Sequence, residues 1–167
     1  MVATEISDIL FGTPSPLSVE VNMGGLKEDH VNIIVHGHEP NLFESMIESC
    51  NEQSLVEEAK KAGAKGINLA GMCCSANELL MRHGIPVAGN YLQQELAMST
   101  GVVDGMVVDV QCIMQALVDL TENFHTKIIT TSPKVKIKGA THIEFDEHNA
   151  LELAEKSVVV VRRPRTV

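Results

Sequence analysis

The stretch VNIIVHGHEPNLFESM, residues 31–46, decides the fold that this chain is expected to adopt. Its first five residues are mostly apolar and β-branched, which predicts a strand buried on both faces. The polar turn HGHEP follows, and Asn41 is a good N-cap for a helix that runs to about Cys50. A buried strand that leads into a helix indicates an α/β protein with a parallel sheet.

The same alternation of apolar strands and helices continues along the chain. Strands are expected at residues 67–72, 85–88, 105–110, 127–131, 141–145 and 158–161. Helices are expected at residues 53–62, 75–82, 93–100, 112–124 and 147–156. This order predicts a doubly wound, mostly parallel, Rossmann-like sheet with helices on both faces. Neither a G-x-G-x-x-G turn nor a P-loop follows the first strand, so the fold alone does not predict nucleotide binding.

The first thirty residues lack this regular pattern. Proline and glycine interrupt the segment repeatedly, and only the first ten residues are expected to contain a short helix. We therefore divide the chain into an irregular N-terminal arm, residues 1–30, and a Rossmann-like α/β domain, residues 31–167. Such an arm is expected to belong to a longer chain or to pack on a neighbouring domain.

The composition excludes several classes of partner. The 167 residues include 13 basic and 22 acidic side chains, for a net charge of −9, and there is no tryptophan and a single tyrosine. The only basic cluster of the chain is Arg162, Arg163 and Arg165, and the chain has few aromatic residues for stacking, so nucleic-acid binding is not expected. No window of about 18 apolar residues is present, and the acidic first thirty residues do not resemble a signal peptide. We expect no membrane span and a cytoplasmic location.

Residues that suit a soft metal gather where the predicted strands end. Ligands of open parallel sheets bind beyond the carboxyl ends of the strands. Three of the four cysteines and two of the seven histidines are expected at this edge, namely Cys73, Cys74, Cys112, His36 and His38. Thiolates together with imidazole suit zinc, iron–sulfur or nickel–iron centres rather than magnesium or calcium.

Two other interpretations of these residues remain open. A cysteine and a histidine could form a nucleophile and base, with Glu39 or Asp109 orienting the imidazole. The thiols could also be buried structural residues, as we expect for Cys50 on a helix elsewhere. Cys74 and Cys112 are both expected to begin helices, where the helix dipole would lower the pKa of a thiol.

The motifs HGHEP (residues 36–40), GMCCSANE (71–78) and DVQC (109–112) together resemble the anaerobic nickel–iron carbon monoxide dehydrogenase family. The resemblance covers nearly the whole chain. It implies an enzyme that oxidises carbon monoxide with water to carbon dioxide, two protons and two electrons, reversibly, at a nickel–iron–sulfur cluster. The catalytic subunit of the family has a helical N-terminal domain and two Rossmann-like domains, and this chain is similar to the middle, first Rossmann-like one.

The resemblance also implies roles for particular residues. The family takes one histidine and two cysteines of its cluster ligands from this domain, and these positions match His38, Cys74 and Cys112. Cys73 would lie next to the cluster, and His36 would orient the ligand loop. Three further cysteines would come from the C-terminal domain, so we expect this chain alone to be inactive.

The implied partners are the helical N-terminal and C-terminal Rossmann-like domains of the same enzyme, a second subunit in a homodimer, and CO or CO2 as substrate. Two alternatives remain beside this interpretation. The chain could be a relative of the hybrid-cluster protein, which resembles the same family in fold. It could also be a non-catalytic α/β module that binds zinc or a partner domain.

Overall fold

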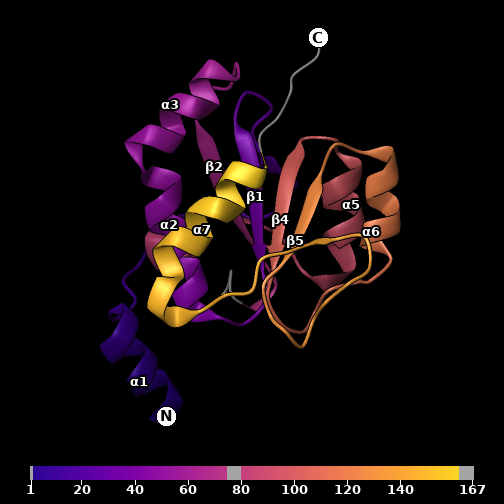
Figure 1. Cartoon of the computed structure of the whole chain (residues 1–167). Helices are drawn as coiled ribbons and strands as arrows, with labels where there is room; N and C mark the ends of the chain where they lie inside the picture. The colour runs from indigo at the N-terminus through magenta and orange to yellow at the C-terminus, as the bar shows by residue number, and fades with distance from the viewer. Residues whose placement is uncertain (1, 75–79, 162–167) are drawn as a thin grey trace.

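The computed structural model describes residues 2–74 and 80–161, and these residues form a six-stranded parallel sheet with helices on both faces (Figure 1). The strands are β1 (Val31–His36), β2 (Ile67–Met72), β3 (Val87–Gly89), β4 (Val103–Val108), β5 (Lys127–Thr130) and β6 (Thr141–His142). Their order across the sheet is β3-β2-β1-β4-β5-β6, and every one of these pairings is parallel. This is the order of a doubly wound Rossmann-like sheet, as the sequence predicts.

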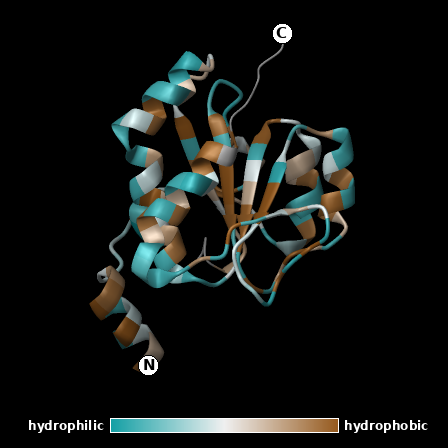
Figure 2. Ribbon diagram, viewed as in Figure 1, coloured by the Kyte–Doolittle hydropathy of each residue, from teal (hydrophilic) through white to brown (hydrophobic). Residues whose placement is uncertain are grey.

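Helices α2 (Pro40–Asn51), α3 (Gln53–Lys61) and α7 (Ala150–Val160) cover one face, and α5 (Gln94–Ser99) and α6 (Leu117–Leu120) cover the other (Figure 1). Alternate residues of β1 lie on opposite faces of the sheet. Ile33 and Val35 belong to the apolar cluster that contains α2, α3 and α7, whereas Ile34 belongs to the cluster that contains α5 and α6. The central strands are therefore mostly apolar, because both of their faces are buried (Figure 2).

The N-terminal arm contains two short helices. Helix α1 (Val2–Phe11) confirms the helix expected in the first ten residues and lies apart from the sheet (Figure 1), and the 3-10 helix η1 (Met23–Gly25) follows. Val21 forms an isolated parallel bridge to Val87, so the arm lies against the β3 edge of the sheet. The domain boundary at residue 31 stays a prediction.

Two predicted elements are wrong. The helix expected at residues 112–124 is much shorter, because α6 begins at Leu117 and ends at Leu120, followed by the 3-10 helix η4 (Thr121–Asn123). The strand expected at residues 158–161 is instead the end of α7. A run of valines favours a strand, but here Val158 and Val161 share one buried side of the chain with Ala154, and that tertiary contact overrides the propensity.

Other boundaries shift by a few residues. Strand β4 begins and ends two residues earlier than expected, and the strand expected at residues 85–88 is observed as Val87–Gly89. The strand expected at 141–145 has two residues, and the helix expected at 147–156 begins as the 3-10 helix η5 (Glu147–Asn149) before α7. The helix expected at 75–82 falls mostly outside the described residues, and its described end is the 3-10 helix η2 (Leu80–His83).

The sheet order brings three strand ends together. The last residue of β1, His36, pairs with Met72 at the end of β2 and with Val108 at the end of β4. The loops that follow these three strands therefore begin side by side at the middle of one sheet edge. In the described part of the chain, no helix has the length and apolar character needed to cross a membrane.

Candidate metal centre

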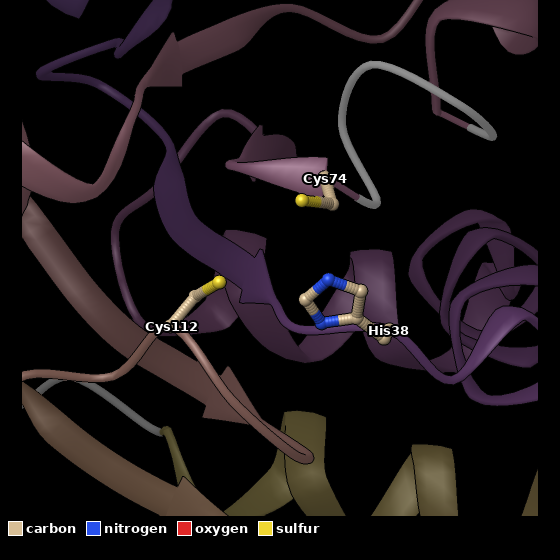
Figure 3. Close-up of side chains that lie close together, drawn as sticks. All are labelled: His38, Cys74 and Cys112. Atoms are coloured by element: carbon tan, nitrogen blue, oxygen red, sulfur yellow. The ribbon is translucent and has the colours of Figure 1, made fainter.

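Three side chains of types that can bind a metal meet beyond the ends of β1, β2 and β4 (Figure 3). A ring nitrogen of His38 and the Sγ atoms of Cys74 and Cys112 all lie within 4.8 Å of one another. Two ligands of one metal lie at most about twice a bond length of about 2.0–2.3 Å apart, so the three atoms are near enough to be candidate ligands of one metal. His38 and Cys74 are exposed and Cys112 is partly buried, which leaves the centre open on one side.

The contacts of the His38 ring indicate which of its two nitrogens carries the proton. Nδ1 lies 3.2 Å from the carbonyl oxygen of Val110. Because a carbonyl only accepts, Nδ1 carries the proton in this contact, and Nε2 keeps the lone pair that a metal needs. A backbone carbonyl that fixes the tautomer in this way is typical of histidines that bind metals.

Asp109 holds the loop that carries His38. The backbone N–H of His38 donates to both carboxylate oxygens of Asp109, at 2.8 and 2.7 Å, and the N–H groups of Glu39 and Val110 donate to the same carboxylate. Burial raises the pKa of Asp109, while these N–H donors oppose that shift. The residue is 2% exposed, so one buried carboxylate joins the loop after β1 to the loop after β4.

Gly37 makes this contact possible. Its φ of 133° is a conformation that residues with a side chain rarely adopt, and a Cβ there would lie 1.5 Å from Oδ1 of Asp109. The glycine between the two histidines of the HGHEP motif is therefore required by the approach of the Asp109 carboxylate.

The cysteine loops also have unusual backbone. Cys73, Gln111 and Cys112 have φ values of 61°, 62° and 57°, in the left-handed region that costs a residue with a side chain about 1–3 kcal/mol. Such conformations persist only where their surroundings hold them, and they cluster at functional sites.

The Cys112 thiol lacks the helix dipole that the sequence predicts for it, whereas the helix expected to begin at Cys74 falls mostly outside the described residues. No helix begins at Cys112, and burial together with Cys74 raises the pKa of the Cys112 thiol. Burial first, and then the neighbouring Cys112 and Cys74, raise the pKa of Cys73 to about 11. Metal binding must therefore displace thiol protons, as it does at most cysteine sites.

Comparison with known proteins identifies the family of this chain. The family model described as the prismane/CO dehydrogenase family matches residues 1–162. The chain belongs to this family.

Carbon monoxide dehydrogenase 1 of Carboxydothermus hydrogenoformans is 58% identical over 160 residues, which cover 95% of this chain and 25% of the relative. Carbon monoxide dehydrogenase 1 of Methanosarcina mazei is 55% identical over 158 residues, with the same two shares. A nickel-free crystal structure of carbon monoxide dehydrogenase from Thermococcus sp. AM4 is similar with a TM-score of 0.92 and 53% identity, over 99% of this chain and 27% of that one. The chain thus spans about a quarter of the length of the relatives that it matches.

Within this family fold, the structure separates the two histidines of HGHEP. His36 is the last residue of β1 and is fully buried, and neither of its ring nitrogens has a hydrogen-bond partner among the described residues. Burial, followed by the nearby His38, lowers its pKa to about 4. Its backbone carbonyl accepts the N–H of Asp109 at 3.2 Å, so its link to the ligand loops runs through the backbone. A loop-orienting role for the ring stays a prediction.

The remaining polar residues argue against a cysteine–histidine nucleophile. Glu39 rather than Asn41 is the N-cap of α2, and its carboxylate accepts the Asn41 N–H at 3.3 Å. The Asp109 carboxylate binds backbone N–H groups. In the described contacts, neither carboxylate forms a hydrogen bond with the His38 ring. Its Nδ1 contacts the Val110 carbonyl instead. The orienting carboxylate that this mechanism needs is therefore missing from the described contacts of His38.

Sequence reasoning missed one residue that supports the centre. Gln94 lies on α5 and is fully buried, and its amide binds the carbonyl of Cys112 and the N–H of Met114, on either side of Ile113. Its place in the sequence, 18 residues before Cys112, gives no signal of this contact. Cys50, in contrast, lies buried on α2, and burial raises the pKa of its thiol to about 12, as expected for a structural cysteine.

Proposed function

We propose that this chain is the first Rossmann-like domain of a nickel–iron carbon monoxide dehydrogenase, and that His38, Cys74 and Cys112 are ligands of its metal cluster. The observation that carries the proposal is the meeting of these three side chains, from three adjacent strand ends, within 4.8 Å. The family membership and the carbon monoxide dehydrogenase names of the relatives support it.

The chemistry of the donor set fits the group. Two thiolates and one imidazole are ligands for iron, nickel and zinc, and they are poor ligands for hard cations. Oxidation of CO with water to CO2, two protons and two electrons is the chemistry that the bound cluster supplies. The residues of this chain hold and orient it: Nε2 of His38 is free to bind, and Asp109 fixes the backbone that carries the imidazole.

The remaining cluster ligands would come from the rest of the enzyme, at the open side of the centre. Three ligands do not complete a cluster shell, and the exposure of His38 and Cys74 leaves room for cysteines from another domain. We propose that a second Rossmann-like domain covers this edge of the sheet and that the complete enzyme is a cytoplasmic homodimer acting on CO and CO2. Cys73 is buried close to Cys74 and Cys112, which supports a role for it in shaping the cluster pocket.

Two alternative functions predict different metal contents at the same residues. A hybrid-cluster relative would hold iron and sulfide without nickel, and a zinc module would hold one zinc without sulfide. The two carbon monoxide dehydrogenases that are 55% and 58% identical favour the nickel–iron enzyme over both.

The experiment uses a full-length carbon monoxide dehydrogenase that carries this sequence, prepared without oxygen. Cys74→Ala and Cys112→Ala are each expected to abolish CO oxidation and to lower the content of nickel, iron and acid-labile sulfide. Cys50→Ala, a buried cysteine outside the centre, is the matched control and is expected to retain both. Full activity in either ligand variant would overturn the assignment, and zinc without sulfide in the wild type would favour the zinc module.

A further inference from the structure

The loop that carries Cys112 has no regular structure of its own. It runs from Asp109, after the end of β4, to Ala116, before the start of α6, and it includes the left-handed residues Gln111 and Cys112. A loop in this conformation must be held by groups outside it, because its backbone alone favours other conformations. Asp109 anchors the beginning of the loop through the contacts described above.

Gln94 anchors the middle of the same loop from a different element. Its Nε2 donates to the carbonyl oxygen of Cys112 at 2.6 Å, and its Oε1 accepts the N–H of Met114 at 3.1 Å. Both ends of one side-chain amide are thus satisfied by the backbone on either side of Ile113. The side chain is fully buried on α5, so water does not compete for these bonds.

The neighbouring glutamines do not share this arrangement. Gln93, next in the chain, accepts the N–H of Asn90 and completes a capping box on the 3-10 helix η3 (Tyr91–Gln93). Gln115, at the end of the same loop, is exposed. The contact with the Cys112 backbone is therefore specific to position 94 among these three residues.

We propose that Gln94 is a positioning residue of the metal centre, whose amide holds the backbone around Cys112 so that Sγ faces His38 and Cys74. The inference rests on the proposed metal-binding function of these three residues. Gln94 does not itself bind the metal; it acts through the carbonyl of Cys112 and the N–H of Met114. Groups that orient metal ligands in this way typically change metal affinity by about 10- to 100-fold when they are removed.

The test is a titration of the reduced 167-residue chain with Co2+ under anaerobic conditions, followed by the thiolate-to-cobalt absorption band. Gln94→Met has nearly the same shape and removes both hydrogen bonds. We expect it to weaken Co2+ binding roughly 10-fold or more and to change the shape of the band. Gln115→Met is the matched control on the same loop and should bind as the wild type does.

Two further measurements separate positioning from a general loss of structure. The melting temperature of the metal-free variants is recorded beside the titration, because a purely structural role would lower it and leave the affinity and band of the folded protein unchanged. Should Gln94→Met fail to fold, Gln94→Glu keeps the acceptor for Met114 and loses the donor to Cys112, and we expect the same loss of affinity.

The outcomes are distinct for the two proposals. A Gln94 variant that folds and binds Co2+ with wild-type affinity and an unchanged band would overturn the positioning role while leaving the centre intact. A wild-type chain that binds no Co2+ through its thiols would contradict the metal centre itself, and the role of Gln94 with it.

Discussion

The buried carboxylate of Asp109 accepts several backbone hydrogen bonds. Two ligand-bearing loops depend on it, because it accepts from His38 and Glu39 after β1 and from Val110 after β4. Hydrogen bonds to a charged acceptor contribute more than those between neutral groups. The carboxylate is therefore the residue on which the geometry of the centre depends most.

Asp109→Asn tests this dependence. One carboxylate oxygen becomes an NH2 group that faces the backbone donors, so we expect the free energy of unfolding to fall by about 1–3 kcal/mol. Urea denaturation of the metal-free chain measures the change. Asp119→Asn, at an exposed position on α6, is the control and should change stability little. Equal stability of the two variants would contradict the role given to Asp109.

A second prediction for a single residue concerns Gly37. Gly37→Ala places a Cβ against Oδ1 of Asp109 in addition to straining a φ of 133°, and we expect it to cost about 3 kcal/mol or more. Gly63→Ala has a φ of 89° and nothing within 4 Å of the new Cβ, so it should cost about 1–2 kcal/mol. Thermal denaturation of both variants compares them, and a smaller loss at Gly37 than at Gly63 would count against the collision.

The sequence motifs predict which residues gather at the centre, because each motif follows a strand whose end is recognisable. His38, Cys74 and Cys112 do come together. The anchors were less predictable. Gln94 acts on a loop 18 residues away, and Asp109 acts on His38 across 71 residues. Such contacts depend on how the elements pack against one another, so they cannot be predicted from a local sequence pattern.

At the scale of elements, helix α7 shows why some predictions fail. Its last three residues and the C-cap Val161 are four consecutive valines, which favour a strand when taken alone. In the structure, this end of the helix packs against the sheet beside Gly105 of β4, where a Cβ would lie 2.4 Å from Cγ2 of Val161. Long apolar strands such as β1 and β2 were predictable because burial on both faces leaves a continuous apolar run.

This contact between α7 and β4 gives a prediction of its own. Gly105→Ala is expected to cost about 1–3 kcal/mol, because its methyl group displaces Val161. Val161→Ala makes room for that methyl group, so the double variant should lose less stability than the sum of the two single variants. A double-mutant cycle by urea denaturation measures the coupling. Strict additivity would mean that the two side chains do not meet.

Taken as a whole, the described residues form a six-stranded Rossmann-like sheet, and the proposed metal centre among them has three protein ligands. The order β3-β2-β1-β4-β5-β6 places β1 at the centre, with the ligand loops of β2 and β4 on either side. Apolar residues of α1 remain exposed, namely Val2, Ile6, Ile9 and Leu10, and Figure 2 shows the hydrophobic colour of much of this helix. Both features are consistent with a domain that works inside a larger enzyme.

We therefore expect the isolated 167-residue chain, supplied with iron, nickel and sulfide under anaerobic conditions, to show no CO oxidation with an electron-accepting dye. The full-length enzyme assayed in parallel is the control. Three protein ligands leave the remaining cluster positions without donors, which is the physical reason. Sustained turnover by the isolated chain would contradict the division of ligands between domains.

The central claim is that His38, Cys74 and Cys112 bind metal directly. Anomalous X-ray diffraction at the iron edge, from crystals of the full-length enzyme grown without oxygen, locates the iron atoms without reference to activity. We expect iron within bonding distance of Nε2 of His38 and of Sγ of both cysteines. Iron located elsewhere, with these three side chains free of metal, would contradict it.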